Sequence, residues 1–389
     1  MSNPEAIQSR DYASGIRVVW SEAGDTKPFC KAMASHASEQ EWALGLIWFS
    51  ATRHNAQTLS ETLHQLAPQF TFCGCSTSGE ITPDGLQESG VVALLLPVKW
   101  FTVSICTLPD VSILGMESIA RLASETRVDF LQSLDTDDPV FALNMIDGLT
   151  YSEELVTVAL DRGLDGIPLI GGSAGDDLHF ERTWQIHNGL TYTGAAVVAL
   201  IQCRLPCQTF TNNNFVPTDY KLVVTEADPE QRKVIEFNAQ PAARAYAEAI
   251  GSTVDELDTG SFASHSVVVK SGGKYYCRSI QKLNEDESLT FFCAIDHGLV
   301  LTVARSEGIV ASSHAAIDLI EEAIGPIDML FGFDCIYRKL DVQHRQTSHR
   351  IASLYQDTNF IGFNTYGEQY NSMHINQTFT GIAIGTPSD

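Results

Sequence analysis

Residues 168–177 read Pro168-Leu169-Ile170-Gly171-Gly172-Ser173-Ala174-Gly175-Asp176-Asp177, a short apolar strand that enters a glycine-rich turn ending in glycine and an acid. Two other stretches have the same order. They are Gly74-Cys75-Ser76-Thr77-Ser78-Gly79-Glu80 after an apolar strand at 70–73, and Gly362-Phe363-Asn364-Thr365-Tyr366-Gly367-Glu368 after one at 359–361. A layout that recurs along one chain indicates a repeated structural unit. The three turns therefore predict three copies of one unit.

Each turn is flanked by the same elements. An apolar strand and a stretch of helical period come before it, and another apolar strand follows it. The opening strands are 44–49, 140–145 and 329–333, the helix faces are Leu59/Leu63/Leu66, Leu155/Val158/Ala159 and Ile351/Leu354/Tyr355, and the closing strands are 90–96, 195–201 and 379–384. Strands that alternate with helices predict an α/β protein with mixed sheets. The near-continuous apolar strands predict sheets that are covered on both faces.

The stretch between the second and third units, residues 205–326, has a different pattern. Residues 212–217 contain turn-forming residues without an apolar period, and they predict a linker. Residues 221–225 and 234–237 predict a pair of strands, and Pro241 opens a predicted helix that ends at Gly251. Apolar stretches between 267 and 303 predict antiparallel strands. The middle of the chain is therefore expected to be α+β.

The chain of 389 residues is strongly acidic, with 48 Asp and Glu against 24 Lys and Arg and a formal charge of −24. A nucleic-acid binder needs a basic face for phosphates, and an anionic membrane surface repels a chain of this charge. The longest apolar run, residues 91–98, falls short of the ~18 residues that a membrane-spanning helix needs. Residues 1–5 are polar and do not resemble a secretory signal. We therefore expect a cytoplasmic protein without nucleic-acid or membrane partners.

The nine cysteines are irregularly spaced, and no CxxC pair occurs among them. Many lie in apolar, strand-like contexts, where a free thiol is commonly buried. We expect reduced thiols, as in a cytoplasmic protein, and no structural zinc site.

The residues of the glycine-rich turns allow three interpretations of their role: a phosphate cradle, a catalytic nucleophile or a tight strand reversal. A phosphate cradle needs a helix directly after the turn, but residues 176–186 continue in an extended pattern and no GxxxxGK[ST] motif occurs. A nucleophile such as Cys75, Ser76 or Ser173 lacks the G-x-S-x-G elbow and a complete catalytic set, so we do not expect an enzyme. The glycines could simply permit tight strand reversals. Three turns that meet at one cavity would favour a binding module instead.

Three of the 11 histidines lie within or just after a glycine-rich turn and near an apolar strand: His179, His187 and His374. A structural role is the simpler interpretation of each, because no HxxxH or HExxH spacing marks a metal site. A single axial haem ligand needs no such spacing, only an apolar pocket. Sequence alone therefore neither excludes haem binding nor selects the iron ligand.

The three turns and the stretch His374-Ile375-Asn376-Gln377-Thr378 together resemble the FIST sensory domain family. The resemblance covers almost the whole chain. It implies a two-domain architecture, with a FIST N-terminal sensory domain at 1–205 and a FIST C-terminal domain at 206–389. It also implies a bacterial intracellular sensory module that binds a small ligand and takes part in signal transduction.

Within that family the chain is most similar to the haem-binding, nitric-oxide-sensing NosP branch. The similar segments are residues 176–184, 213–219 and 362–381. This resemblance implies haem b whose ferrous iron binds nitric oxide, and a signalling partner that is a histidine kinase or a diguanylate cyclase or phosphodiesterase. The sequence contains no kinase, GGDEF or receiver segment, so we expect the output to pass through a separate protein. The sequence leaves open whether the protein forms a homodimer.

The same resemblance points to candidate haem contacts. His187 is the preferred iron ligand, because it follows the NosP-like stretch, and His374 and His179 are the alternatives. Arg182 is expected to bind a haem propionate, and Lys221 and Arg338 are further bases. The alternative function is a FIST module that binds an amino acid or another small metabolite without haem, in a hydrophilic pocket formed by the three turns.

Overall fold

The structure is a computed structural model that describes residues 7–271 and 273–387. Its elements fall into three similar units and one inserted module. The first unit contains β1 (Gln8–Asp11), β2 (Arg17–Ser21), α1 (Thr26–Glu39), β3 (Trp42–Phe49), α2 (Ala56–Leu66), β4 (Phe72–Ser76), β5 (Glu80–Thr82), β6 (Gly85–Gln87) and β7 (Val91–Pro97). The second contains β8 (Phe101–Leu108), α3 (Met116–Gln132), β9 (Val140–Asp147), α4 (Glu153–Leu164), β10 (Leu169–Ala174), β11 (Gln185–His187), β12 (Leu190–Tyr192) and β13 (Ala196–Cys203).

The third unit is interrupted by the inserted module. It contains β14 (Cys207–Asn213), α7 (Ile309–Ile324), β23 (Ile327–Cys335), α8 (Ile336–His344), α9 (Ser348–Asp357), β24 (Phe360–Thr365), β25 (Glu368–Tyr370), β26 (Met373–Ile375) and β27 (Thr378–Gly385). The module contains β15 (Phe215–Asp228), β16 (Lys233–Phe237), β17 (Gln240–Pro241), α5 (Ala242–Ile250), a 3-10 helix (Val254–Glu256), α6 (Thr259–Ser264), β18 (Val267–Ser271), β19 (Lys274–Arg278), β20 (Ile280–Leu283), β21 (Leu289–Phe291) and β22 (Val300–Ser306).

The three units build three sheets of one design. Their strand orders are β1-β2-β7-β3-β4-β11-β12, β8-β13-β9-β10-β25-β26 and β14-β27-β23-β24-β5-β6. In each sheet the opening strand is parallel to the strand that enters the turn and antiparallel to the closing strand. The predicted α/β class and the threefold repeat are both confirmed.

Each sheet ends in a hairpin that belongs to another unit. Hairpin β5–β6 of the first unit pairs with β24 of the third, β25–β26 of the third pairs with β10 of the second, and β11–β12 of the second pairs with β4 of the first. The exchange is cyclic, so each sheet is completed by a neighbour. We refer to these three sheets and their helices as the body.

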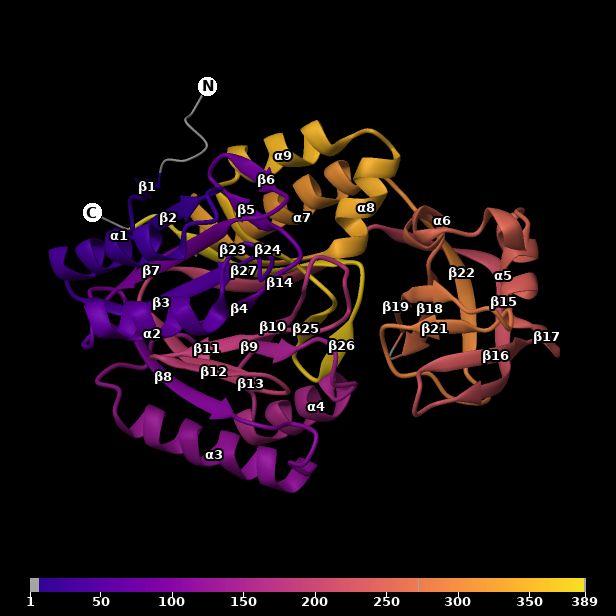
Figure 1. The fold of residues 1–389 in the computed structure, drawn as a ribbon, viewed down its shortest axis with the longest axis horizontal. Coiled ribbons are helices and arrows are strands. Elements are labelled where there is room, and N and C mark those ends of the chain that lie inside the picture. Colours follow the sequence, from indigo (N-terminus) through magenta and orange to yellow (C-terminus); the bar gives the residue numbers. More distant parts are fainter. Residues whose placement is uncertain (1–6, 272, 388–389) are drawn as a thin grey trace.

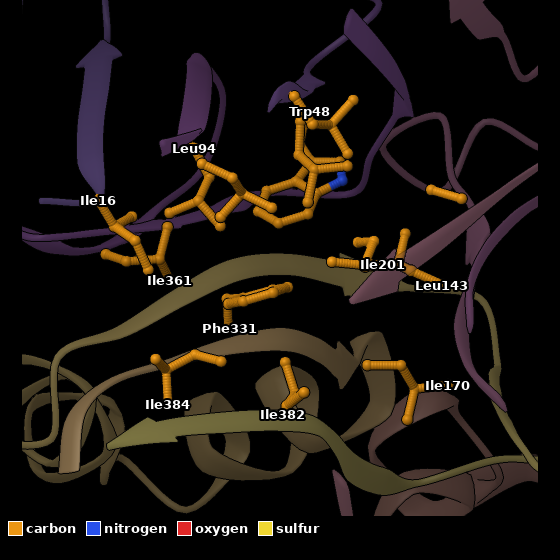
Figure 2. Packing of buried hydrophobic residues seen from close by; sticks show 14 of the residues in the cluster. Ile16, Trp48, Leu94, Leu143, Ile170, Ile201, Phe331, Ile361, Ile382 and Ile384 are labelled. Atoms are coloured by element: carbon orange, nitrogen blue, oxygen red, sulfur yellow. The ribbon is translucent and has the colours of Figure 1, made fainter. Parts of the chain in front are cut away.

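The centre of the body is a shared apolar core between the inner faces of the three sheets. Figure 2 shows Trp48 and Leu94 from the first unit above Phe331 and Ile382 from the third, with Leu143 from the second beside them. The outer faces pack separate apolar clusters with the helices. Both faces of the central strands are therefore buried, which confirms the interpretation of the near-continuous apolar strands.

Three local predictions are wrong. Leu66, placed on the apolar face of the first predicted helix, is 47% exposed on α2. Leu155 and Val158 of α4 are 39% and 41% exposed, while Val156, Ala159 and Leu160 are buried. Only Ala159 of the predicted face therefore packs in the core, because the core-facing positions of α4 are 156, 159 and 160 at helical spacing.

The predicted linker at 212–217 instead belongs to two strands. The backbones of Asn212 and Asn213 pair with Phe379 and Thr378 of β27, and Phe215 begins the long strand β15. An edge strand is specified by backbone pairing, so the absence of an apolar period did not exclude one.

The inserted module lies beside the body in Figure 1 and contains an eight-stranded sheet. The strand pair β15 and β16 and helix α5 confirm the predicted α+β middle. Hydrogen bonds tie the module to α8. Tyr337 Oη donates to the Ile280 carbonyl at 2.6 Å, and Asp341 accepts from Ser264 Oγ and from Ser306 Oγ at 2.8 Å each. Over the described part of the chain, no helix combines the length and the apolar character needed to cross a membrane.

Candidate ligand-binding site

The three glycine-rich turns meet in the body and hydrogen-bond to one another. The backbone bonds run from Ser78 N to the Asn364 carbonyl (3.1 Å), from Gly175 N to the Ser76 carbonyl (3.1 Å) and from Ser173 N to the Gly367 carbonyl (2.7 Å). Each turn therefore contacts both of the others. The convergence that would favour a binding module is present.

Glycine is required at two of these positions. Gly79 has φ +123°, and a Cβ atom there would lie 2.7 Å from Lys339 Nζ and 2.9 Å from the Gln87 carbonyl oxygen. A Cβ atom at Gly175 would collide with Ser78 Oγ. The glycines therefore allow a lysine and a serine to approach the turn backbone closely.

The acids that end the first and third turns are part of the architecture. Glu80 and Glu368 are fully buried, and each accepts a hydrogen bond from the threonine three residues earlier, at 2.5 Å from Thr77 Oγ1 in the first turn. Burial raises the pKa of both carboxyls to about 8. Neither side chain is placed to bind a ligand from solvent.

The acid of the second turn orders the loop that follows. Asp176 accepts backbone hydrogen bonds from residues 180, 181 and 182, at 2.7–2.9 Å, and a further one from Tyr366 Oη of the third turn. Within this loop Asp177, Leu178 and Phe180 have φ values of +57°, +64° and +55°. Strained backbone of this kind is concentrated at functional sites.

A pocket of about 390 Å³ opens between this loop, the first turn and α8. Its lining residues are Thr52, Arg53, Ser78, Glu88, Ser89, Asp177, Leu178, His179, Ile336, Lys339, Leu340 and Gln343. We call it the turn pocket. Ser78 is 2% exposed, and its Oγ has no hydrogen-bond partner among the described residues. A buried polar atom of this kind needs a partner, which a bound ligand or water would supply.

Charges of both signs line the turn pocket. Lys339 is only 6% exposed, and its Nζ lies 3.2 Å from the Ser78 carbonyl oxygen and 3.2 Å from Glu88 Oε2. Asp177 Oδ2 accepts hydrogen bonds at 2.9 Å from the hydroxyls of Ser50 and Thr52. A positive and a negative group in the lining of one pocket suit a ligand that carries both charges.

The three candidate histidines lie in separate surroundings. His179 lines the turn pocket, and its Nδ1 lies 2.7 Å from the Asp176 carbonyl oxygen, which raises the pKa of the imidazole. His187 lies on β11, where Nδ1 is 3.0 Å from Thr107 Oγ1, and partial burial lowers its pKa. His374 lies on β26 inside the body, and burial lowers its pKa to about 4.

The predicted bases are also dispersed. Arg182 stacks over the Trp184 ring, with its guanidinium carbon 5.2 Å from the ring centroid. Arg338 is 2% exposed and forms a buried ion pair with Asp334 at 2.5 Å, so it is not accessible to a ligand. Lys221 is exposed on β15 of the module.

The surroundings of His374 and of His179 do not fit a haem. His374 is neutral and its Nε2 has no partner among the described residues, but a Cβ atom at Gly367 would lie 3.0 Å from that nitrogen, which leaves no space for a porphyrin. The turn pocket beside His179 is lined by charged groups, whereas haem needs apolar walls. In the described residues no group of three or more His, Cys, Asp or Glu is arranged to hold a metal ion.

Sequence reasoning missed Lys339 and Asp177 as site residues. Lys339 lies in a polar helix whose contact with the first turn spans 261 positions of sequence, and no local pattern marks it. Asp177 directly follows the second turn. Its place next to a turn that was expected to meet the other two is the signal that could have identified it as a site residue.

Two family models match most of the chain. The family model described as the FIST N domain matches residues 43–240, and the model described as the FIST C domain matches residues 242–371. One curated relative is an uncharacterized protein, MJ1623, of Methanocaldococcus jannaschii. It is 28% identical over 199 residues, which are 50% of this chain and 38% of that protein. This chain therefore matches well under two thirds of that relative's length.

Proposed function

The chain belongs to the FIST family, whose domains are sensory modules, and from this premise we propose that its turn pocket binds a small ligand with one carboxylate and one ammonium group, such as an amino acid. The observation that carries the proposal is the buried Ser78, whose Oγ has no partner among the described residues and whose carbonyl oxygen lies 3.2 Å from Lys339 Nζ, in a pocket that Asp177 also lines. Lys339 and Arg53 would bind the carboxylate, Ser78 Oγ would donate to it, and Asp177 would accept from the ammonium group.

The position of α8 supports a sensory role for this pocket. One face of the helix lines the turn pocket with Ile336, Lys339, Leu340 and Gln343, which follow the i, i+3, i+4, i+7 spacing of a helix face. Another face carries Tyr337 and Asp341, which hydrogen-bond to the inserted module. A ligand that draws Lys339 toward itself would therefore act on the helix that holds the module, and would bias two arrangements of the protein.

Binding to the turn pocket is tested by thermal-shift and calorimetric titration with free amino acids and with matched amines and carboxylic acids. We expect one or more amino acids to raise the Tm, and Asp177→Asn and Lys339→Met each to weaken that ligand by roughly tenfold, because each removes a charged partner. Asp219→Asn, an exposed carboxylate on β15, is the matched control. The proposal fails if no amino acid binds, or if both pocket variants bind as tightly as the control.

Haem-dependent nitric oxide sensing, with a histidine kinase or a cyclic-di-GMP enzyme as partner, stays a separate prediction that rests on the NosP-like segments. Titration with hemin tests it directly. A haem sensor takes up one equivalent, and its Soret band moves when nitric oxide binds the ferrous protein. His187→Ala should then change the band, with Arg182→Ala as a second variant. Absence of stoichiometric uptake contradicts the haem function without affecting the turn pocket. The expectation that the chain is not an enzyme also stays a prediction.

A further inference from the structure

A second pocket, of about 510 Å³, lies where the inserted module meets the body. Its walls come from the module strand β19, from hairpin β25–β26 and from the β14 and β27 edge of the third sheet. Figure 1 shows β19 on the side of the module that faces β26. We call it the junction pocket. It shares no lining residue with the turn pocket, and its volume is in the range of small-molecule sites.

Aromatic side chains from both sides line the junction pocket. Phe215, Tyr275 and Tyr276 come from the module, and Tyr370 comes from the body. Met373 on β26 adds a polarizable thioether. Four aromatic rings around one space favour a flat, unsaturated ligand, because ring faces and edges attract one another beyond the burial of apolar area.

The charge of the junction pocket is opposite to that of the chain. Lys274 lines it, and Lys270 Nζ lies 5.4 Å from the centroid of the Tyr275 ring. None of the described lining residues is an acid, although Asp and Glu number 48 in the sequence. A pocket that excludes acids and contains a lysine in so acidic a protein favours an anionic group on its ligand.

Besides hydroxyls and Lys274, the polar groups of this pocket include two amides. The Oδ1 atoms of Asn213 and Asn371 each accept a backbone hydrogen bond, from Phe215 N and Leu169 N at 3.3 Å, which fixes both amides. Each amide keeps an NH2 group, which can only donate. Lysine and amide donors together recognise carboxylate oxygens.

We propose that the junction pocket binds a small aromatic carboxylate, with its ring among the tyrosines and its carboxylate at Lys274. This site is independent of the turn pocket and of the function proposed for it. A ligand here touches the module and the body at once, so its binding would hold β19 and hairpin β25–β26 together.

Calorimetry and saturation-transfer NMR with 4-hydroxybenzoate as the probe test the proposal. Cyclohexanecarboxylate keeps the carboxylate and the approximate size but has no aromatic face, and benzylamine keeps the ring but reverses the charge. We expect 4-hydroxybenzoate to bind with ring protons saturated by the protein, and the other two compounds to bind at least roughly fivefold more weakly. Equal binding of all three, or no binding of 4-hydroxybenzoate at millimolar concentration, overturns the proposal.

Two variants with matched controls locate the site. Lys274→Met and Tyr276→Leu should each weaken 4-hydroxybenzoate by roughly fivefold. Lys282→Met, on β20, and Tyr220→Leu, 62% exposed on β15, change the same residue types outside the pocket and should leave the affinity unchanged. Circular dichroism confirms that each variant is folded. Binding that is unaffected by both pocket variants, or equally weakened by the controls, overturns the assignment. Asp177→Asn should not alter this affinity, which separates the two sites.

Discussion

Glu80 and Glu368 show what a buried acid does at the scale of one residue. Both end a glycine-rich turn, both bond to a threonine three positions earlier, and both have a pKa raised to about 8 by burial. Part of the acid excess therefore belongs to the interior, where these groups favour their neutral form. An acid whose folded pKa is raised binds its proton more tightly in the folded state.

The consequence for Glu80 is a stability that falls as pH rises. Its contribution is fully present below the unfolded pKa of 4.5 and is lost as pH approaches the folded value of about 8. We expect Glu80→Gln, which keeps an acceptor for Thr77, to be more stable than the wild type at pH 8 by roughly 1–3 kcal/mol and to lose that advantage near pH 5. Urea unfolding of both proteins between pH 5 and pH 8 measures the difference. A difference that is independent of pH contradicts the assigned protonation.

The exchanged hairpins are the distinctive feature at the scale of elements. Ile186 belongs to β11 of the second unit, but it is fully buried in the outer core of the first. Leu190, on the partner strand β12, is 59% exposed. One hairpin of the second unit therefore supplies a core residue to the first unit, while its other strand carries a leucine at the surface.

A pair of alanine variants tests whether this hairpin stabilises the first unit. Ile186→Ala should lower the free energy of unfolding by about 2–5 kcal/mol, because it leaves a cavity in a closed core. Leu190→Ala should change it by less than about 0.5 kcal/mol. Urea unfolding gives both values, and hydrogen exchange should show faster exchange of β4 amides in the first variant alone. Equal effects of the two substitutions would mean that the hairpin does not pack as described.

The sequence predicted the units but not their exchange. Apolar strands, helical periods and turns are local patterns, and they identified the three copies and the mixed sheets. Strand β11 pairs with Gly74 and Cys75 of β4, about 110 positions away in the sequence, and no local pattern encodes that pairing. A pocket at the three turns could be expected, but Lys339 as part of it was missed for the same reason, because this side chain reaches the first turn only in the folded chain. The linker prediction at 212–217 failed because edge-strand pairing requires no apolar period.

The body and the inserted module are joined by buried charges at the scale of the whole molecule. Arg232 of the module is 3% exposed and bonds to Glu153 at 2.8 Å and to Glu154 at 2.6 Å, both at the start of α4. Its guanidinium carbon lies 4.8 Å from the centroid of the Tyr151 ring. Burial raises the pKa of Glu153, and the charge of Arg232 opposes that rise. Arg232 therefore favours the ionised form of a carboxylate whose burial favours the neutral form.

Removal of this arginine should loosen the junction in a pH-dependent way. Arg232→Met leaves Glu153 buried without its cation, and we expect a loss of about 3–5 kcal/mol at pH 8 that shrinks toward pH 5, where Glu153 can take up a proton. Arg232→Met with Glu153→Gln should recover part of that loss, since the fully buried carboxylate is then neutral and only Glu154, 26% exposed, keeps its charge. Arg244→Met removes a largely exposed pair with Glu287 and should cost less than about 1 kcal/mol. Urea unfolding monitored by hydrogen exchange of β16 and α4 distinguishes the outcomes. If the double variant is no more stable than Arg232→Met, packing rather than charge holds the module to the body.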